Sequence, residues 1–82
     1  MIFKPQNILY DHDDFKIAWG LWSEDETECL GMRWKSYPYE RGGDEAWLVI
    51  PDDLSIGIMK ALISKDGSNL NEIFQVLMKI NP

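Results

Sequence analysis

The run Asp11-His12-Asp13-Asp14 gathers the side chains of this chain that are best suited to hold a metal ion. Three carboxylates stand beside the only imidazole of the sequence, and oxygen ligands suit a hard divalent cation. A calcium loop, however, needs alternating acids, a glycine and a distal glutamate, and these do not follow here. Aspartate also favours turns, because its side chain hydrogen-bonds to the nearby backbone. We therefore predict a solvated turn at this position and no metal site.

Nucleophilic catalysis requires a nucleophile, a base and a group that orients the base, and no motif of the sequence supplies all three. His12 is the single imidazole, and Cys29 falls in a strand-like segment, where a small buried thiol is expected. One histidine and one cysteine also exclude a structural zinc site made of four Cys and His ligands. There is no glycine-rich phosphate loop. We expect a protein that is not an enzyme and that uses no cofactor.

Acidic side chains are concentrated in one part of the chain. The whole sequence has 14 acidic and 8 basic residues, a formal net charge of −6, and the segment 11–28 accounts for all of it. Such acids could imitate a phosphate backbone and occupy a nucleic-acid-binding protein as a decoy. They could equally form solvated turns that aid solubility and protect a sheet edge. The candidate acidic-surface residues are Asp11, Asp13, Asp14, Glu24, Asp25, Glu26 and Glu28.

Basic and aromatic side chains alternate in the segment 33–43. Trp, Tyr and Arg are enriched at protein–protein hot spots, whereas aromatics beside cations also grip single-stranded nucleic acid. The net negative charge argues against nucleic acid and against an anionic membrane surface. A third interpretation is a connecting loop whose tyrosines pack back onto the sheet edge. The candidate contact residues are Trp22, Arg33, Lys35, Tyr37, Tyr39 and Arg41.

The order of the expected elements indicates an α+β fold. Two segments in which apolar and polar side chains alternate flank an acidic turn, and together they predict a β-hairpin. Further along, Pro-Asp-Asp separates a short apolar run from two stretches of helical periodicity. Strands followed by helices favour an antiparallel sheet with the helices on one face. We predict a sheet of three or four strands in a single domain 1–82. The strands are the hairpin 15–22/28–35, an edge strand at 7–10, and strand 45–50, which is apolar enough to be covered on both faces. The two helices are expected at about 53–65 and 70–80.

The hairpin register follows from keeping both apolar sets on one face, because a slip of one residue would expose one set. The predicted pairs are Leu21 with Leu30, Trp19 with Met32, Ile17 with Trp34, and Gly20 with Gly31. Trp19 and Trp34 would then lie in the core, and Trp22 would cover the facing glycines on the outer face. Lys16 would oppose Lys35, and such like-charged pairs predict a bulge or an end to the pairing.

Residue Gly57 interrupts the first predicted helix, where glycine costs about 1 kcal/mol relative to alanine. Close approach of the helix to a bulky neighbour such as Trp19 or Trp34 would account for it. At the start of this helix, Asp52 or Asp53 is expected to cap the first turn. In the second helix, Asn69 and Glu72 have the spacing of a capping box.

The leading hypothesis is a cytoplasmic, non-catalytic binding or regulatory protein. It would engage a protein partner through the open sheet face, with Trp22, Arg33 and Lys35, and through the loop that carries the tyrosines. The alternatives are the acidic decoy and a nucleic-acid-binding module that uses the segment Arg33–Arg41. A homodimer is a further expectation, because a chain of 82 residues has a thin core that self-association would support. No membrane-spanning segment is expected.

Overall fold

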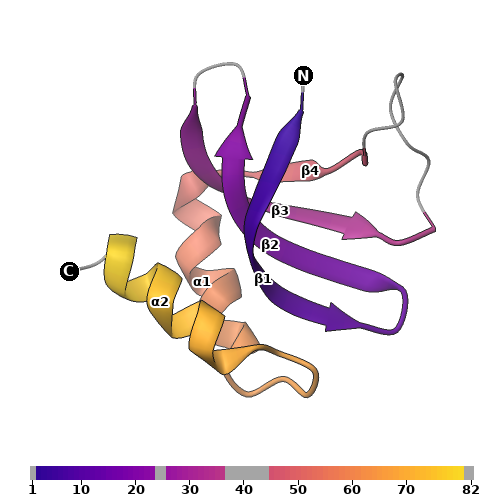
Figure 1. Cartoon of the computed structure of the whole chain (residues 1–82). Coiled ribbons are helices and arrows are strands. Elements are labelled where there is room, and N and C mark those ends of the chain that lie inside the picture. The colour runs from indigo at the N-terminus through magenta and orange to yellow at the C-terminus, as the bar shows by residue number, and fades with distance from the viewer. Residues whose placement is uncertain (1, 24–25, 37–44, 81–82) are drawn as a thin grey trace.

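Four antiparallel strands, arranged in the order in which they follow one another in the chain, form a sheet against which two C-terminal helices pack (Figure 1). The computed structural model describes residues 2–23, 26–36 and 45–80. The predicted α+β fold is confirmed. The elements are β1 (Phe3–His12), β2 (Phe15–Trp22), β3 (Thr27–Trp34), β4 (Leu48–Ile50), α1 (Asp52–Leu62) and α2 (Leu70–Ile80).

The β2–β3 hairpin has the predicted faces but a register displaced by two residues. Trp19 pairs with Leu30, and Trp22 pairs with Thr27 at the end of the hairpin. The turn is closed by a hydrogen bond of 2.9 Å from the Glu26 N–H to the Trp22 carbonyl, with Glu26 in the left-handed region at φ 56°. A shift of two residues leaves every side chain on its original face, so the apolar pattern permits both registers, and the turn selects one.

Strand β1 is longer than predicted, since it runs from Phe3 to His12, whereas the expected edge strand covered only residues 7–10. Its pairing with β2 shifts between Pro5 and Asn7 and again between Ile8 and Tyr10, so it holds two extra residues. Each extra residue bends the strand and reverses the alternation of its side chains. As a result, Phe3 lies on the outer face of the sheet, whereas Leu9 and Tyr10 lie under the helices.

Two hydrophobic clusters lie on opposite faces of the sheet. The main core, between sheet and helices, holds Leu9, Tyr10, Ile17, Trp19, Leu30, Ile50, Met59, Leu62, Ile73 and Val76. A smaller outer cluster joins Phe3, Ala18 and Cys29 with the partly buried Trp22, Trp47 and Val49. The predicted burial of Trp19 and of the Cys29 thiol is confirmed. The predicted burial of Trp34 is wrong, because 55% of this residue is exposed.

The two glycines of the hairpin are covered by β1, and they do not face each other. Gly20 pairs with Cys29, and Gly31 pairs with Ala18. A Cβ atom on Gly20 would overlap the Lys4 carbonyl group and would lie 2.8 Å from the Pro5 Cα atom. A Cβ atom on Gly31 would lie 2.9 Å from the ring of Phe3. Trp22 is therefore not their cover, and the outer face of the sheet is less open than predicted.

The helix starts differ in how well they were predicted. Asn69 Oδ1 accepts a hydrogen bond of 3.4 Å from the Glu72 N–H at the start of α2, as the capping spacing predicts. Helix α1, in contrast, follows Pro51 without a side-chain cap, and its two aspartates lie inside the first turn, where they suit the helix dipole. The turn between the helices is tied to β1 by a hydrogen bond of 2.8 Å from the Asn69 N–H to the Leu9 carbonyl.

The glycine of α1 has no packing role. A Cβ atom on Gly57 would meet nothing within 4 Å, so the expected close contact with a tryptophan is wrong. This position is exposed on the helix surface, and glycine there only adds conformational freedom to the unfolded chain.

We expect Gly57→Ala to raise the free energy of unfolding by about 0.5–1 kcal/mol, because alanine is the better helix former and nothing crowds the added methyl group. Urea denaturation and the Tm measure the effect. The matched control is Gly20→Ala, which should lower stability by about 1–3 kcal/mol because backbone atoms of β1 block its methyl group. An unchanged or lower Tm for Gly57→Ala would contradict the open environment of this residue.

Candidate functional site

An apolar groove of about 470 Å³ lies where the end of β3 meets the segment that leads into β4. Phe15 and Met32 form its inner part and pack at the edge of the main core. Trp34 and Leu48 form its outer part and are 55% and 67% exposed. The remaining lining residues are Arg33, Ala46 and Trp47. We call this feature the groove.

The aromatic walls of the groove are held in place by neighbouring rings and by a cation. Phe15 and Trp34 pair directly across β2 and β3, and their ring centroids are 4.7 Å apart at an interplanar angle of 57°. The ring of Trp47 lies 5.0 Å from that of Phe3, and Lys16 Nζ lies 5.6 Å from the Trp47 ring centroid. These contacts orient the walls in advance, so a ligand would find the aromatic surface already arranged.

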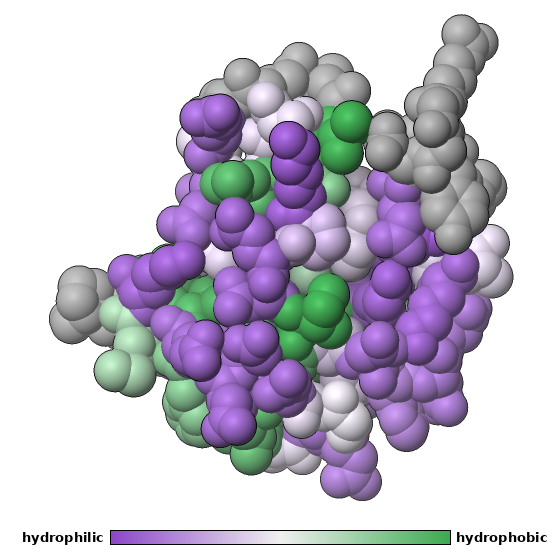
Figure 2. Space-filling model, in the orientation of Figure 1, coloured by the Kyte–Doolittle hydropathy of each residue, from purple (hydrophilic) through white to green (hydrophobic). Residues whose placement is uncertain are grey.

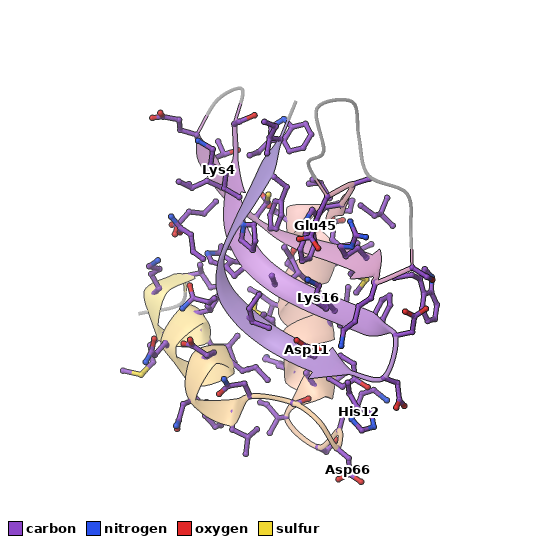
Figure 3. All side chains as sticks on the ribbon, turned by 45° about the vertical axis from the view of Figure 1, so that its right-hand side comes forward. Lys4, Asp11, His12, Lys16, Glu45 and Asp66 are labelled. Atoms are coloured by element: carbon purple, nitrogen blue, oxygen red, sulfur yellow. The ribbon has the colours of Figure 1, made fainter. Side chains whose placement is uncertain are left out.

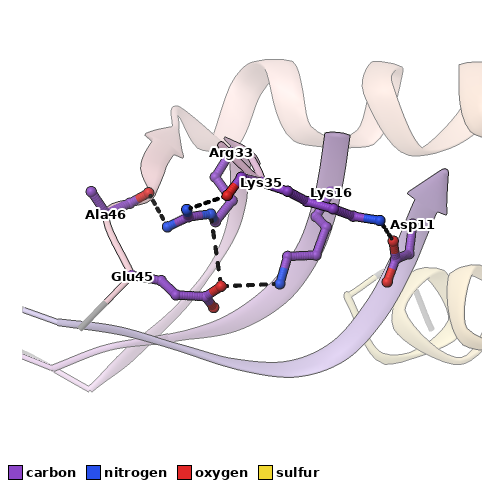
Figure 4. A network of polar contacts seen from close by, with 6 residues as sticks. All are labelled: Asp11, Lys16, Arg33, Lys35, Glu45 and Ala46. Carbon is purple, nitrogen blue, oxygen red and sulfur yellow. Dashed lines mark hydrogen bonds and ion pairs between the residues drawn. The ribbon is translucent and has the colours of Figure 1, made fainter. Parts of the chain in front are cut away.

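Beside the groove lies a buried arginine that connects β3 to the segment before β4. Arg33 is only 3% exposed. Its Nη1 donates to the Ala46 carbonyl at 3.2 Å, and its Nη2 donates to the Lys35 carbonyl at 3.3 Å (Figure 4). The Nε atom lies 3.8 Å from a carboxylate oxygen of Glu45. A planar guanidinium suits this task, because its donors point in several fixed directions at once.

The same carboxylate oxygen of Glu45 also accepts a hydrogen bond of 3.1 Å from Lys16 Nζ. Lys16 and Arg33 are directly paired across β2 and β3, so two cations face each other on the sheet. Glu45 lies beside Lys16 on the side of the sheet away from the helices (Figure 3). This shared anion explains why the strands stay paired here. The predicted opposition of Lys16 and Lys35 is wrong, and at Lys16 the pairing of β2 with β3 shows neither the bulge nor the end that this opposition implied.

The sequence-predicted contact residues have different environments. Arg33 was expected on an open face, but its burial removes it from the accessible surface. Trp22 is partly buried against the outer cluster. Lys35 is exposed, and its ammonium group forms an ion pair with Asp11 (Figure 4). Three further candidates, Tyr37, Tyr39 and Arg41, lie outside the described residues.

The acidic candidates at the end of β1 and in the β1–β2 turn are partly engaged within the chain. Asp11 pairs with Lys35, and Asp14 accepts a hydrogen bond of 2.8 Å from the Ser36 hydroxyl group. Asp13 is largely exposed and has φ 53°, a conformation that aspartate tolerates in turns. His12 Nε2 lies 3.4 Å from an Asp13 carboxylate oxygen. The turn predicted over Asp11–Asp14 is shorter than expected: it comprises Asp13 and Asp14, whereas Asp11 and His12 belong to β1 and pair with β2.

The acids of the hairpin end include one carboxylate with two donors. Glu28 accepts hydrogen bonds from Lys79 Nζ at 2.8 Å and from Trp19 Nε1 at 3.4 Å. The hydrogen bond from Lys79 is the main reason why the pKa of Glu28 lies below its ordinary value. Glu26 is exposed, and Glu24 and Asp25 lie outside the described residues. Glu28 thus links the hairpin to the last turn of α2.

The lining of the groove consists of aromatic and aliphatic side chains together with the buried Arg33. Among residues 2–23, 26–36 and 45–80, no group of three or more His, Cys, Asp or Glu side chains could hold a metal ion. The described helices are also too short and too polar to cross a membrane. The groove instead offers aromatic and aliphatic surface, with the cations of its neighbourhood bound to Glu45 and to backbone carbonyls.

Sequence reasoning missed most of the groove. The strand around residues 46–50 was expected to be covered on both faces, but β4 has only three residues and ends the sheet, and Leu48 is exposed. An apolar run looks the same in a covered strand and in an exposed one. Trp34 was assigned to the core because it shares the apolar face of its strand with Leu30 and Met32, yet it is exposed. No local signal distinguishes these cases, because the covering helices come from a distant part of the chain.

We expect Glu45→Gln to lower the free energy of unfolding by about 1–3 kcal/mol, because it leaves two paired cations without their shared anion. Urea denaturation measures the loss. Adding Lys16→Met should recover part of it, since only one cation then remains. The control Asp11→Asn breaks the more exposed pair with Lys35 and should cost less than about 1 kcal/mol. Equal losses for Glu45→Gln and Asp11→Asn would refute the special role of Glu45.

We expect Lys79→Met to raise the pKa of Glu28 towards its ordinary value, because the main donor that lowers it is removed. The lowered pKa stabilises the fold above the unfolded-state pKa of the carboxyl group, and this contribution is lost as the pH falls through the folded-state pKa. The acid-induced loss of stability should therefore be smaller in the variant. NMR titration of the Glu28 carboxyl carbon measures the shift, and Lys60→Met on α1 is the control that should leave it unchanged.

Comparison with known proteins adds no assignment. No family model matches the chain, and neither the curated proteins nor the solved structures include a match. The function must therefore be inferred from the groove, the ion pairs around it and the distribution of charge.

Proposed function

We propose that this protein is a non-catalytic protein-binding domain that holds an apolar segment of a partner protein in the groove. The observation that carries the proposal is the joint exposure of Trp34 and Leu48 at the mouth of a hollow with aromatic walls. Large apolar side chains that remain exposed together mark interaction sites on soluble proteins. Tryptophan is also the residue type that most often dominates binding energy at protein interfaces.

The charge around the groove favours a partner with basic residues next to its apolar segment. Asp13 and Asp14 directly precede Phe15, which pairs with Trp34 in the groove wall. The side chain of Asp13 is 87% exposed, so its carboxylate is accessible to a partner. The net charge of −6 would steer a basic partner towards the whole surface. The proposal includes a cytoplasmic location as expected from the sequence.

This proposal changes the contact residues expected from the sequence while keeping the class of function. Trp34 and Leu48 replace Arg33 as the residues on which binding depends. Arg33 is buried, and its guanidinium group already donates to backbone carbonyls of this chain. The acidic-decoy and nucleic-acid hypotheses have less support. Asp11 and Glu28 have cationic partners within the chain, which reduces the negative charge available to a basic enzyme.

A random peptide library displayed on phage and selected against the whole chain tests the proposal. We expect the selected peptides to combine aliphatic or aromatic residues with Lys or Arg. Synthetic copies should bind the variant Trp34→Ala/Leu48→Ala at least about tenfold more weakly than the wild type, a loss of about 1.4 kcal/mol or more, as measured by fluorescence polarisation.

The control is Leu54→Ala, which removes another exposed apolar side chain, on α1 and outside the groove. It should bind the peptides like the wild type. Circular dichroism and the Tm confirm that all variants are folded. Failure to select any peptide, or equal binding by wild type and Trp34→Ala/Leu48→Ala, would contradict the proposal. Charge reversal at Asp13 and Asp14 should weaken binding mainly at low salt.

A further inference from the structure

A second apolar surface, unrelated to the groove, runs along helix α2. Leu70, Phe74 and Met78 are 44%, 46% and 73% exposed. Their spacing of four residues places them on one side of the helix, next to the side that packs into the core through Ile73 and Val76. Figure 2 shows hydrophobic side chains gathered over α2 at the lower left of the molecule. We call these three residues the α2 stripe.

The outer border of the α2 stripe carries no unpaired charge on the helix. The outer neighbours are Asn71 and Gln75, which carry amide side chains, and Lys79, which is paired with Glu28. The two charged residues of α2 make contacts with the sheet. Glu72 accepts a hydrogen bond of 3.2 Å from Asn7 Nδ2, and Lys79 donates one of 2.8 Å to Glu28. In a chain in which 27% of residues are charged, this surface of α2 is therefore apolar and neutral.

The neutral surroundings of the α2 stripe indicate which kind of partner can bind to it. Two copies of a chain with net charge −6 repel each other, so a self-contact must form where the local charge is lowest. A basic partner, in contrast, would be attracted to the acids near the groove, because Asp11, the acid that shares a hollow with Leu70 at one end of the α2 stripe, is paired with Lys35. We propose that the α2 stripe binds the α2 stripe of a second copy of this chain, with the two helices antiparallel about a two-fold axis.

Antiparallel pairing makes the contact self-complementary, as a two-fold interface requires. Phe74 lies at the centre of the stripe and would meet its counterpart at the axis, while Leu70 of each copy would meet Met78 of the other. With 11 residues, α2 is about 16 Å long, so two such helices bury less area than the standard interface of about 800 Å² per partner. A weak dimer, with a Kd of about 1–100 μM, is the expectation.

The test is sedimentation velocity of the whole chain from about 1 to about 500 μM, a range that spans the expected Kd. The wild type should shift from monomer to dimer as the concentration rises. Leu70→Glu or Met78→Lys alone should weaken the dimer, because each places a charge against an apolar side chain. The double variant Leu70→Glu/Met78→Lys should restore it, since antiparallel pairing brings each glutamate to a lysine of the other copy.

The matched control is Leu70→Lys/Met78→Lys, which places like charges together and should remain a monomer although it lowers the net negative charge. A wild type that is monomeric at every concentration overturns the proposal. A dimer that persists in this control, or that is absent from the Leu70→Glu/Met78→Lys variant, overturns it as well. Leu48→Lys in the groove should leave the dimer intact, so self-association and peptide binding fail or succeed independently.

Discussion

The hydrogen bonds of the buried Arg33 fix the segment that enters β4, and the shape of the groove depends on this segment. One guanidinium group contacts the backbone carbonyls of Lys35 and Ala46 and lies beside Glu45, so it connects the end of β3 to the segment that enters β4. Burying a cation is costly unless its donors are satisfied, and here backbone and carboxylate oxygens surround it. Once this segment is fixed, the positions of Trp47 and Leu48 follow, and with them the shape of the groove.

The outer face of the sheet is covered largely by β1. The bulged strand β1 crosses from one face to the other, so it supplies Leu9 to the main core and Phe3 to the outer cluster. Its backbone lies so close to Gly20 that no side chain fits there. Most of the outer face is thus closed by the chain itself. Among the described residues, apolar side chains remain exposed at the groove and along the α2 stripe, and also at other positions such as Leu54 on α1.

The groove and the α2 stripe differ in the charges that lie near them, and for this reason a different partner is proposed for each. The groove lies near an exposed aspartate and the ion-pair network, whereas the α2 stripe has amide side chains along its outer side. A basic partner gains from the first setting and a second acidic copy from the second. One small domain could therefore use both surfaces at the same time without competition between them.

The elements whose signals are local could be predicted from the amino-acid sequence. The helical periodicity and the Asn69 cap define α2, alternation defines the hairpin, and aspartates define the turn at Asp13. Each of these depends on neighbours within a few residues, so it can be derived without knowledge of the remaining chain. The faces of the hairpin were also predictable, because alternation with a period of two survives the shift of two residues in the register.

The environment of each side chain on those elements depends on how distant segments pack together in three dimensions. Arg33 is buried because Ala46 and Glu45, more than ten residues away, supply its acceptors, whereas Trp34 next to it is exposed. Gly20 is needed because β1 approaches it, and Gly57, in open space, has no such neighbour. Burial depends on contacts between distant segments, and composition and periodicity do not contain that information.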